Sequence, residues 1–239
     1  MVGHIVITHS IGGSKMASHE HPARAERILR AAGSLVVSIG YDKTTIADVA
    51  RRAGVAKGTI YLHWPTREAL FTALVHHERI GMIVDCRERL GVDGDELDKV
   101  FEQLARALMS RPVVKAFIVN DSSVLGRLAY APVYSVNRHL WDDLAAAEVI
   151  RTDLEPWALT ELASAVFFGF FLVTPLTPSG KKISDDDTAR LIGDAMNRAL
   201  RRDLPLTIGG QRKIADVVYD YLERAERDAR ATYEASSGA

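Results

Sequence analysis

The chain has 239 residues, of which 47% are apolar and 26% are charged. This composition is typical of a globular protein with one sizeable core or two smaller ones, and it excludes disorder along the whole chain. The net charge of −1 gives no global sign of nucleic-acid binding, so a basic surface for such a partner has to be local. The single cysteine, Cys86, excludes an intramolecular disulfide and indicates a reducing cytoplasm, where we expect an inert, partly buried thiol.

Residues 1–19 are expected to form an irregular arm. Residues 4–8 alternate weakly before Gly12 and Gly13, which faintly suggests a nucleotide-binding turn, but neither GxGxxG nor a later βαβ pattern is present. The segment also lacks the basic start and the unbroken apolar run of a secretory signal. The longest apolar run, near residues 162–176, has about 15 residues, fewer than the ~20 that a membrane span requires. We interpret that run as a buried helix and expect no membrane partner.

From Pro22 onward the apolar residues recur at helical spacing almost to the C-terminus, without a sustained strand pattern. Proline suits the first turn of a helix, and Gly40 ends the first apolar run. Thr45 and Thr66 supply N-caps for the helices that follow them. The sequence therefore predicts an all-α fold, with helices near residues 22–39, 46–52, 56–63, 66–90, 95–110, 113–128, 132–149, 154–174, 185–202 and 210–232.

Residues 45–64 have the spacing of a helix-turn-helix, whose second helix enters the major groove of DNA. Gly54 lies where the turn between the two helices needs a positive φ angle. Between residues 17 and 65, seven basic side chains outnumber four acidic ones, although the whole chain is slightly acidic. Two crossed helices would share a small core made of Ile46, Val49, Ala50, Val55 and Ile60.

The second helix of this motif begins with small residues that would let its backbone approach base edges. Lys57 can reach a guanine or a phosphate, and Tyr61 and His63 project donors toward the DNA backbone. A threonine at a helix N-terminus and an arginine in the first turn of the next helix suit further phosphates. For Arg51 and Arg52, a DNA-facing role and a merely solvated helix face are both open. The predicted DNA contacts are Thr45, Ala56, Lys57, Gly58, Thr59, Tyr61, His63 and Arg67.

The stretch from Arg27 to Leu70 resembles the N-terminal domain of TetR-type (tetracycline-repressor-like) transcriptional regulators. Trp64 stands where that family usually has Phe, Ala56 where Ser is common, and Arg67 where Lys is frequent. The resemblance implies that the predicted contacts face DNA, and that a homodimer represses transcription from a palindromic operator. The matching positions are Ile28, Leu29, Ala32, Gly40, Tyr41, Thr44, Thr45, Ile46, Ala50, Ala53, Gly54, Val55, Lys57, Gly58, Thr59, Ile60, Tyr61, Trp64, Arg67, Glu68 and Leu70.

The larger C-terminal part resembles the family only in its length and helical pattern. By the resemblance, this part is a helical bundle that dimerises and binds a small-molecule inducer, which releases the repressor from DNA. The expected organisation is an arm at 1–19, a three-helix helix-turn-helix domain at 20–66, a connecting helix at 67–90, a ligand-binding and dimerisation domain at 91–232, and a frayed tail at 233–239.

The predicted helix at 154–174 is the best candidate for the dimer interface. It is apolar on every side, so most of its surface has to be covered. Its small residues would allow a close helix contact, and together with the helix at 185–202 it would form a four-helix interface across a two-fold axis. The alternative is that this helix is simply the core of one subunit. The residues expected in the interface are Leu162, Ala165, Gly169, Val173, Ile192 and Met196.

Aromatic residues gather in the middle helices, as they do in the walls of apolar ligand pockets. Phe117, Trp141 and Phe168 are predicted to line a pocket for a small, largely apolar inducer. Ordinary core packing explains the same pattern equally well.

The sequence contains no recognisable catalytic motif. His76 and His77 are adjacent rather than one helical turn apart, and no HExxH, GxSxG or P-loop motif occurs. We therefore predict no catalytic residue, no metal ligand and no cofactor. The rival hypotheses are a helical protein-interaction adaptor, against which the pattern at 57–63 argues, and, with less support, an enzyme.

Overall fold

The computed structural model describes residues 14–91, 96–120, 123–124, 126, 139–173, 183–202 and 208–237. The predicted all-α fold is confirmed: helices dominate this part of the chain, and its only β pairing is an isolated bridge between Ile150 and Arg201. The helices are α1 (Ser14–Ile39), α2 (Ile46–Ala53), α3 (Lys57–His63), α4 (Arg67–Leu90), α5 (Leu97–Met109), α6 (Pro112–Asn120), α8 (Pro156–Val173), α9 (Asp185–Leu200) and α10 (Ile208–Ser236).

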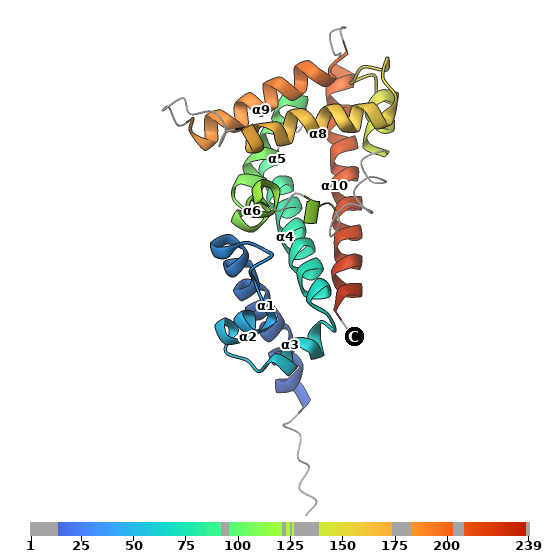
Figure 1. Ribbon diagram of the computed structural model, residues 1–239. Coiled ribbons are helices and arrows are strands. Elements are labelled where there is room, and N and C mark those ends of the chain that lie inside the picture. Colours follow the sequence, from blue (N-terminus) through green and yellow to red (C-terminus); the bar gives the residue numbers. More distant parts are fainter. Residues whose placement is uncertain are drawn as a thin grey trace, which may run out of the picture.

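Two hydrophobic cores organise the molecule. Helices α1, α2 and α3 form a head at the lower end of Figure 1, and α5, α8 and α9 form the upper part of the body. The head core contains Ile28, Val49, Ile60 and Trp64, whereas the body core contains residues of α5, α8, α9 and α10. The two cores divide the described part of the chain into the head, which contains α2 and α3, and the body.

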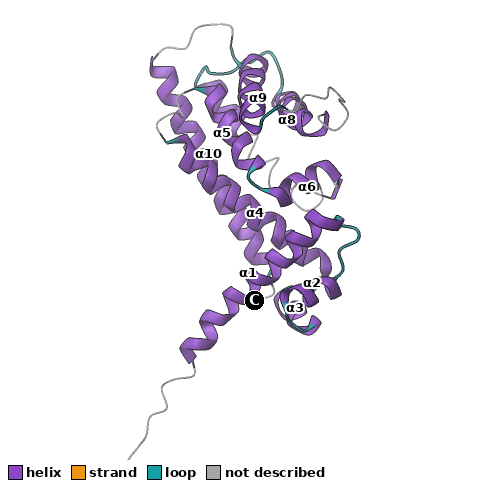
Figure 2. Cartoon of the chain, turned by 90° about the vertical axis from the view of Figure 1, so that its left-hand side faces the viewer, coloured by secondary structure: helices purple, strands orange, loops and turns teal. Residues whose placement is uncertain are grey.

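Helix α4 belongs to both cores and runs from the head into the body (Figure 2). Leu70 and Leu74 in its first half are buried in the head, whereas Ile83 and Leu90 in its second half are buried in the body. The hydroxyl of Thr66 caps its N-terminus by accepting a 2.9 Å hydrogen bond from the Ala69 amide. Because α4 is one continuous helix, a conformational change in the body can be transmitted along it to the head.

Helix α10 lies alongside α4 in Figures 1 and 2 and is longer than predicted. Its buried side chains, such as Leu222 and Ala229, belong to the body core. An ion pair of 2.9 Å joins Arg87 Nη1 of α4 to Glu226 Oε2 of α10. The helix continues to Ser236, and Tyr233 packs against the head core, so part of the predicted frayed tail is helical and packed.

The N-terminal part of the molecule also differs from the prediction. Helix α1 begins at Ser14, inside the expected irregular arm, and residues 1–13 lie outside the described residues. Of the helix predicted at 132–149, residues 132–138 lie outside the described residues, residues 139–146 are helical, and the chain turns at 147–148, so the helix ends earlier than predicted. Cys86 is buried in the body core, and burial raises the pKa of its thiol to about 12, as expected for an inert cysteine.

Candidate nucleic-acid interface

The turn between α2 and α3 has the geometry that the sequence requires. Gly54 adopts φ 65°, in the left-handed region, and the Val55 amide donates a 3.0 Å hydrogen bond to the Ala50 carbonyl. Val49 and Ile60 are fully buried on the facing sides of the two helices. The apolar residues that were predicted to form a small shared core therefore fix the angle at which α3 leaves the head.

Thr45 holds the N-terminus of α2. Its hydroxyl accepts a 3.2 Å hydrogen bond from the Asp48 amide and donates one of 2.5 Å to the Asp48 carboxylate. Hydrogen bonds from Thr45 and then from Arg51 lower the pKa of Asp48, which therefore stays ionised at neutral pH. Thr45 is exposed, so its structural role as a cap is compatible with a phosphate contact at the same helix end.

Helix α3 turns one face to the core and the opposite face to solvent. Ile60 is 0% exposed, whereas Tyr61 is 48% and Leu62 is 78% exposed. Lys57 and Gly58 are exposed as well, and a Cβ built on Gly58 would meet nothing within 4 Å. Of the other predicted contacts, Ala56 is exposed at the N-cap and Thr59 is half-buried. The structure thus brings Ala56 to Thr59 and Tyr61 together at one accessible site.

His63 lies on the core side of α3, which corrects its predicted place among the DNA-facing residues. Its side chain is 5% exposed, and its ring centroid lies 5.3 Å from that of Trp64. The reason is helical geometry, because His63 follows the buried Ile60 by three residues and so shares its face. The i,i+3 spacing in the sequence already carried this signal.

Arg67 fastens the loop before α2 instead of projecting into solvent. Its guanidinium donates hydrogen bonds to the carbonyl oxygens of Tyr41 (2.6 Å, Nη2) and Thr44 (3.3 Å, Nε). The same group lies 4.0 Å from the centroid of the Tyr41 ring and 4.9 Å from that of Phe71. With these contacts, the side chain that was predicted to hold a phosphate is occupied in positioning the segment that leads to Thr45.

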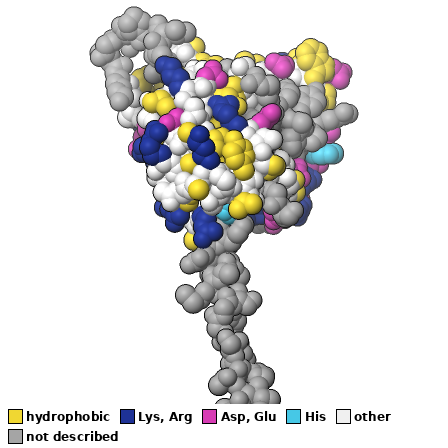
Figure 3. All heavy atoms as spheres, turned by 60° about the horizontal axis from the view of Figure 1, so that its bottom comes forward, with side chains coloured by type: hydrophobic (Ala, Val, Ile, Leu, Met, Phe, Trp, Pro, Cys, Tyr) yellow, Lys and Arg dark blue, Asp and Glu magenta, His cyan; other side chains and the backbone are white. Residues whose placement is uncertain are grey.

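Sequence reasoning missed Leu62, the most exposed large apolar side chain of the described residues. The signal was available, because Leu62 follows Gly58 by one helical turn and lies opposite Ile60. Arg51 and Arg52, whose roles were left open, are exposed, but each has a partner in the chain: Arg51 pairs with Asp48, and Arg52 Nη2 donates to Ser34 Oγ at 2.6 Å. The view onto the head in Figure 3 shows Lys and Arg side chains spread among exposed hydrophobic ones.

Comparisons with known proteins agree with this geometry. Residues 28–74 match the model of "Bacterial regulatory proteins, tetR family". The HTH-type transcriptional repressor KstR of Rhodococcus jostii is 31% identical over 183 residues, which cover 67% of this chain and 84% of KstR. This chain belongs to the tetR family.

Two further comparisons differ in how much of the chain they cover. The HTH-type transcriptional regulator Rv2250c of Mycobacterium tuberculosis is 39% identical over 88 residues, or 36% of this chain and 44% of Rv2250c. The match therefore spans less than half the length of that relative. The solved structure of NalD, described as the secondary repressor of the MexAB-OprM multidrug efflux pump in Pseudomonas aeruginosa, has a TM-score of 0.57 at 20% identity and covers 78% of this chain and 100% of NalD. This likeness extends the shared fold into the C-terminal part.

In this tetR-family chain, α6 joins the head to the body. Phe117 is fully buried in the head core, with its ring centroid 5.8 Å from that of Tyr41. A Cβ on Gly33 of α1 would lie only 2.9 Å from Val113 Cγ2, which shows how closely α1 and α6 approach. The neighbouring Ile118 belongs instead to the body core. A short helix therefore has adjacent residues in both cores.

The three aromatic residues predicted to line a pocket do not meet in one place. Phe117 is in the head core, whereas Trp141 is in the body core, where its Nε1 donates a 2.9 Å hydrogen bond to Thr160 Oγ1. Phe168 is 37% exposed on α8. Phe117 and Trp141 therefore pack in separate cores, and these three residues do not form one pocket.

The predicted dimer residues divide between an outer and an inner layer. On α8, Ala165 and Val173 are exposed and Leu162 and Gly169 are half-buried. On α9, Ile192 and Met196 are buried in the body core, so these two residues pack within the subunit. Other large apolar side chains are exposed on α8 (Trp157 and Leu172) and on α9 and the segment before it (Leu191 and Ile183), and these were not predicted.

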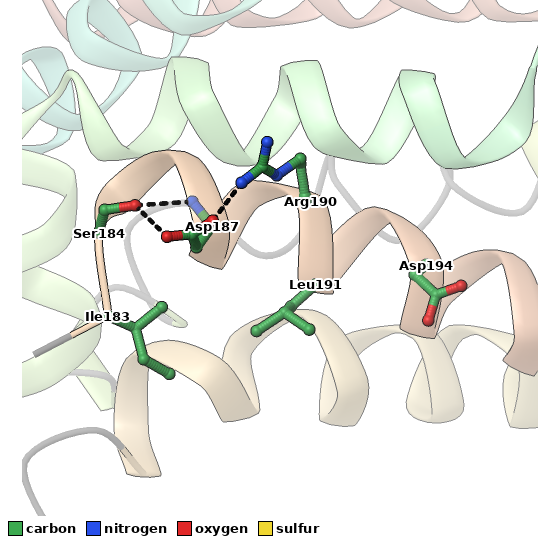
Figure 4. Close-up of a pocket in the computed structure, with 6 residues that line it drawn as sticks. All are labelled: Ile183, Ser184, Asp187, Arg190, Leu191 and Asp194. Atoms are coloured by element: carbon green, nitrogen blue, oxygen red, sulfur yellow. Dashed lines mark hydrogen bonds and ion pairs between the residues drawn. The ribbon is translucent and has the colours of Figure 1, made fainter. Parts of the chain in front are cut away.

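A shallow hollow, open to solvent, lies along α9 (Figure 4). It has a volume of about 720 Å³, and its lining includes Ile183 from the segment before α9 and Leu191 from α9 itself. Ser184 caps the helix by accepting a 3.0 Å hydrogen bond from the Asp187 amide. The lining therefore combines two apolar side chains with charged ones, Asp187, Arg190 and Asp194.

Proposed function

We propose that this chain is a ligand-responsive transcriptional repressor, in which a homodimer binds a palindromic operator through α3. The single observation that carries this proposal is the exposed face of α3, where Lys57 and Tyr61 project away from a packed helix-turn-helix. A helix supported in this way presents its side chains to the edges of bases in the major groove. KstR and NalD, which are both named as repressors, support repression rather than activation.

The proposed DNA contacts are those predicted residues whose side chains or backbone are accessible to solvent. Lys57, Thr59 and Tyr61 supply donors, Ala56 and Gly58 leave room for the DNA backbone, and Thr45 offers a capped helix end to a phosphate. Arg67 holds the loop that ends at Thr45.

Dimerisation through α8 and α9 would cover the outer apolar surface of the body. By length and composition α8 is apolar enough to cross a membrane, and 28% of its residues are buried. Its packing against α9 and α6, however, makes it part of the helical body.

A second copy related by a two-fold axis would bury the same patch twice and place two α3 helices in successive major grooves, about 34–36 Å apart. We therefore propose a cytoplasmic homodimer.

The inducer would act on the body and reach the head through α4 and α6, because each of these helices has fully packed residues in the head core and in the body core. Coupling of this kind is reciprocal, so operator DNA has to weaken inducer binding by the factor by which inducer weakens DNA binding. Equal inducer affinity with and without operator would contradict the proposal.

Selection of bound duplexes from random DNA tests the function directly. The full chain should enrich a palindrome with half-sites about one helical turn apart, because a two-fold dimer presents two identical α3 helices. A matched selection with Lys57→Ala should enrich the same sequence more weakly if the lysine meets a phosphate, or relax one base position if it meets a base. Failure of the unmodified chain to enrich any sequence would contradict DNA recognition.

A further inference from the structure

We propose that Leu62 reads the 5-methyl group of a thymine in each operator half-site. The inference rests on the proposed DNA-binding function and names a base contact within it. Leu62 is 78% exposed, although a leucine gains free energy when its side chain leaves water. An apolar side chain that is this accessible on a supported helix has no packing role in the subunit.

The position of Leu62 on α3 determines what it can meet. It follows the fully buried Ile60 by two residues, which places it about 200° around the helix axis, on the outward face. Gly58 lies one turn before it on the same face, and the space beside Gly58 is open. A surface can therefore come close to the helix at Gly58 and still contact the longer side chain of Leu62.

The surroundings favour DNA as the occupant of this face. The exposed Lys57 is one turn before Tyr61 on α3. On the adjoining helix α2, Arg52 is exposed and donates a hydrogen bond to the neutral Ser34, whereas the exposed Arg51 pairs with Asp48. A cationic surface of this kind is complementary to phosphates. In the major groove, the apolar group that distinguishes one base from the others is the thymine methyl. Leucine carries no hydrogen-bonding group in its side chain, so the methyl is the feature it can recognise.

The test removes the methyl group without changing the pairing of the base. The probe is the duplex that the full chain enriches from random DNA, with each thymine replaced in turn by deoxyuridine. At one thymine per half-site, the unmodified protein should bind about fourfold more weakly, the effect of exposing one methyl-sized group. Leu62→Ala should bind the thymine duplex more weakly by a similar factor and should not respond to deoxyuridine at that position.

Two variants control for general effects on the head. Leu62→Met keeps an apolar side chain of similar size and should retain sensitivity to deoxyuridine. Val37→Ala alters another exposed apolar residue of the head and should leave the deoxyuridine effect unchanged. Circular dichroism should show equal helix content for all variants.

The outcomes separate this inference from the proposed function. If the chain enriches a specific duplex but Leu62→Ala loses as much affinity as the unmodified protein at every deoxyuridine, Leu62 does not read a methyl. An enriched half-site without any thymine would also overturn the inference while leaving DNA binding intact. If no duplex is enriched, the proposed function and this contact fail together.

Discussion

At the scale of single residues, Arg67 shows how an intramolecular contact replaces an expected intermolecular one. Its guanidinium is bound to the carbonyl oxygens of Tyr41 and Thr44 and lies over the ring of Tyr41. A lysine, which is frequent at this position in the family, could not match two carbonyls with a planar fork. The arginine thus positions the start of α2, and any effect on DNA passes through that loop.

Replacing Arg67 by Ala should destabilise the protein in the absence of DNA by about 1–3 kcal/mol, because two part-buried carbonyls lose their donor. Arg67→Lys should recover only part of this loss. Urea unfolding of both variants, followed by circular dichroism, measures the effect. Unchanged stability of Arg67→Ala, together with weaker DNA binding, would instead indicate a direct phosphate contact.

Trp64 carries a polar group that the head core leaves without a partner. The residue is 1% exposed, and its Nε1 has no hydrogen-bond acceptor within the described part of the chain. Trp64→Phe removes this unsatisfied donor, a gain that offsets the loss of packing, so we expect a stability change within about 1 kcal/mol. Trp64→Ala should cost about 3–5 kcal/mol. A loss for Trp64→Phe as large as that for Trp64→Ala would show that the indole N–H is satisfied.

At the scale of secondary-structure elements, α6 links the two cores through neighbouring side chains. Phe117 packs beside Tyr41 in the head, whereas Ile118 packs in the body. A rotation or shift of α6 would therefore change the packing beneath α1 and the loop before α2. This contact gives the body a second route to the reading helix besides α4.

Hydrogen exchange tests this link with two adjacent variants. Phe117→Ala should speed amide exchange in α1 and α2, because it opens a cavity in the head core although the residue belongs to α6. Ile118→Ala should speed exchange in the body helices and leave α1 and α2 protected. If both variants deprotect the same helices, α6 does not distinguish the two cores.

The elements differ in how far the sequence predicts them. The helix-turn-helix was predictable because its core, its caps and Gly54 lie within some twenty residues, where spacing defines the faces. The same rule would have placed His63 inside and Leu62 outside. The location of Phe117 was not predictable, because α6 is apolar on several sides and only tertiary packing decides which core receives each residue. Ile192 and Met196 differ from Phe117, because they share one apolar stripe of α9 with Ala189 and Leu200, and the spacing alone would have placed them inside.

At the scale of the whole molecule, the exposed apolar residues of α8 and α9 are the strongest argument for a dimer. Trp157 and Leu172 are exposed on α8 and Leu191 is exposed on α9, so water contacts large side chains that favour burial. In a two-fold interface each residue would act twice, once from each subunit. The rest of the body would then hold two heads at a fixed spacing.

Leu172→Glu should convert the dimer to a monomer, because the interface would have to bury a carboxylate from each subunit. Sedimentation at micromolar concentration gives the mass directly. Val119→Glu, which changes an exposed apolar residue on α6, should remain dimeric. Dimeric Leu172→Glu, or a monomeric unmodified chain, would rule out this interface.

The most direct test of the account is the salt dependence of binding to the enriched duplex, measured by fluorescence anisotropy for the unmodified chain and Lys57→Ala. We predict nanomolar or tighter affinity, about 10⁻⁸–10⁻¹¹ M at physiological salt, with a steep loss of affinity as salt rises. Lys57→Ala should bind more weakly, and if the lysine meets a phosphate the salt slope should fall by about one. Identical affinity and slope for the two proteins would contradict the claim that the exposed face of α3 reads DNA.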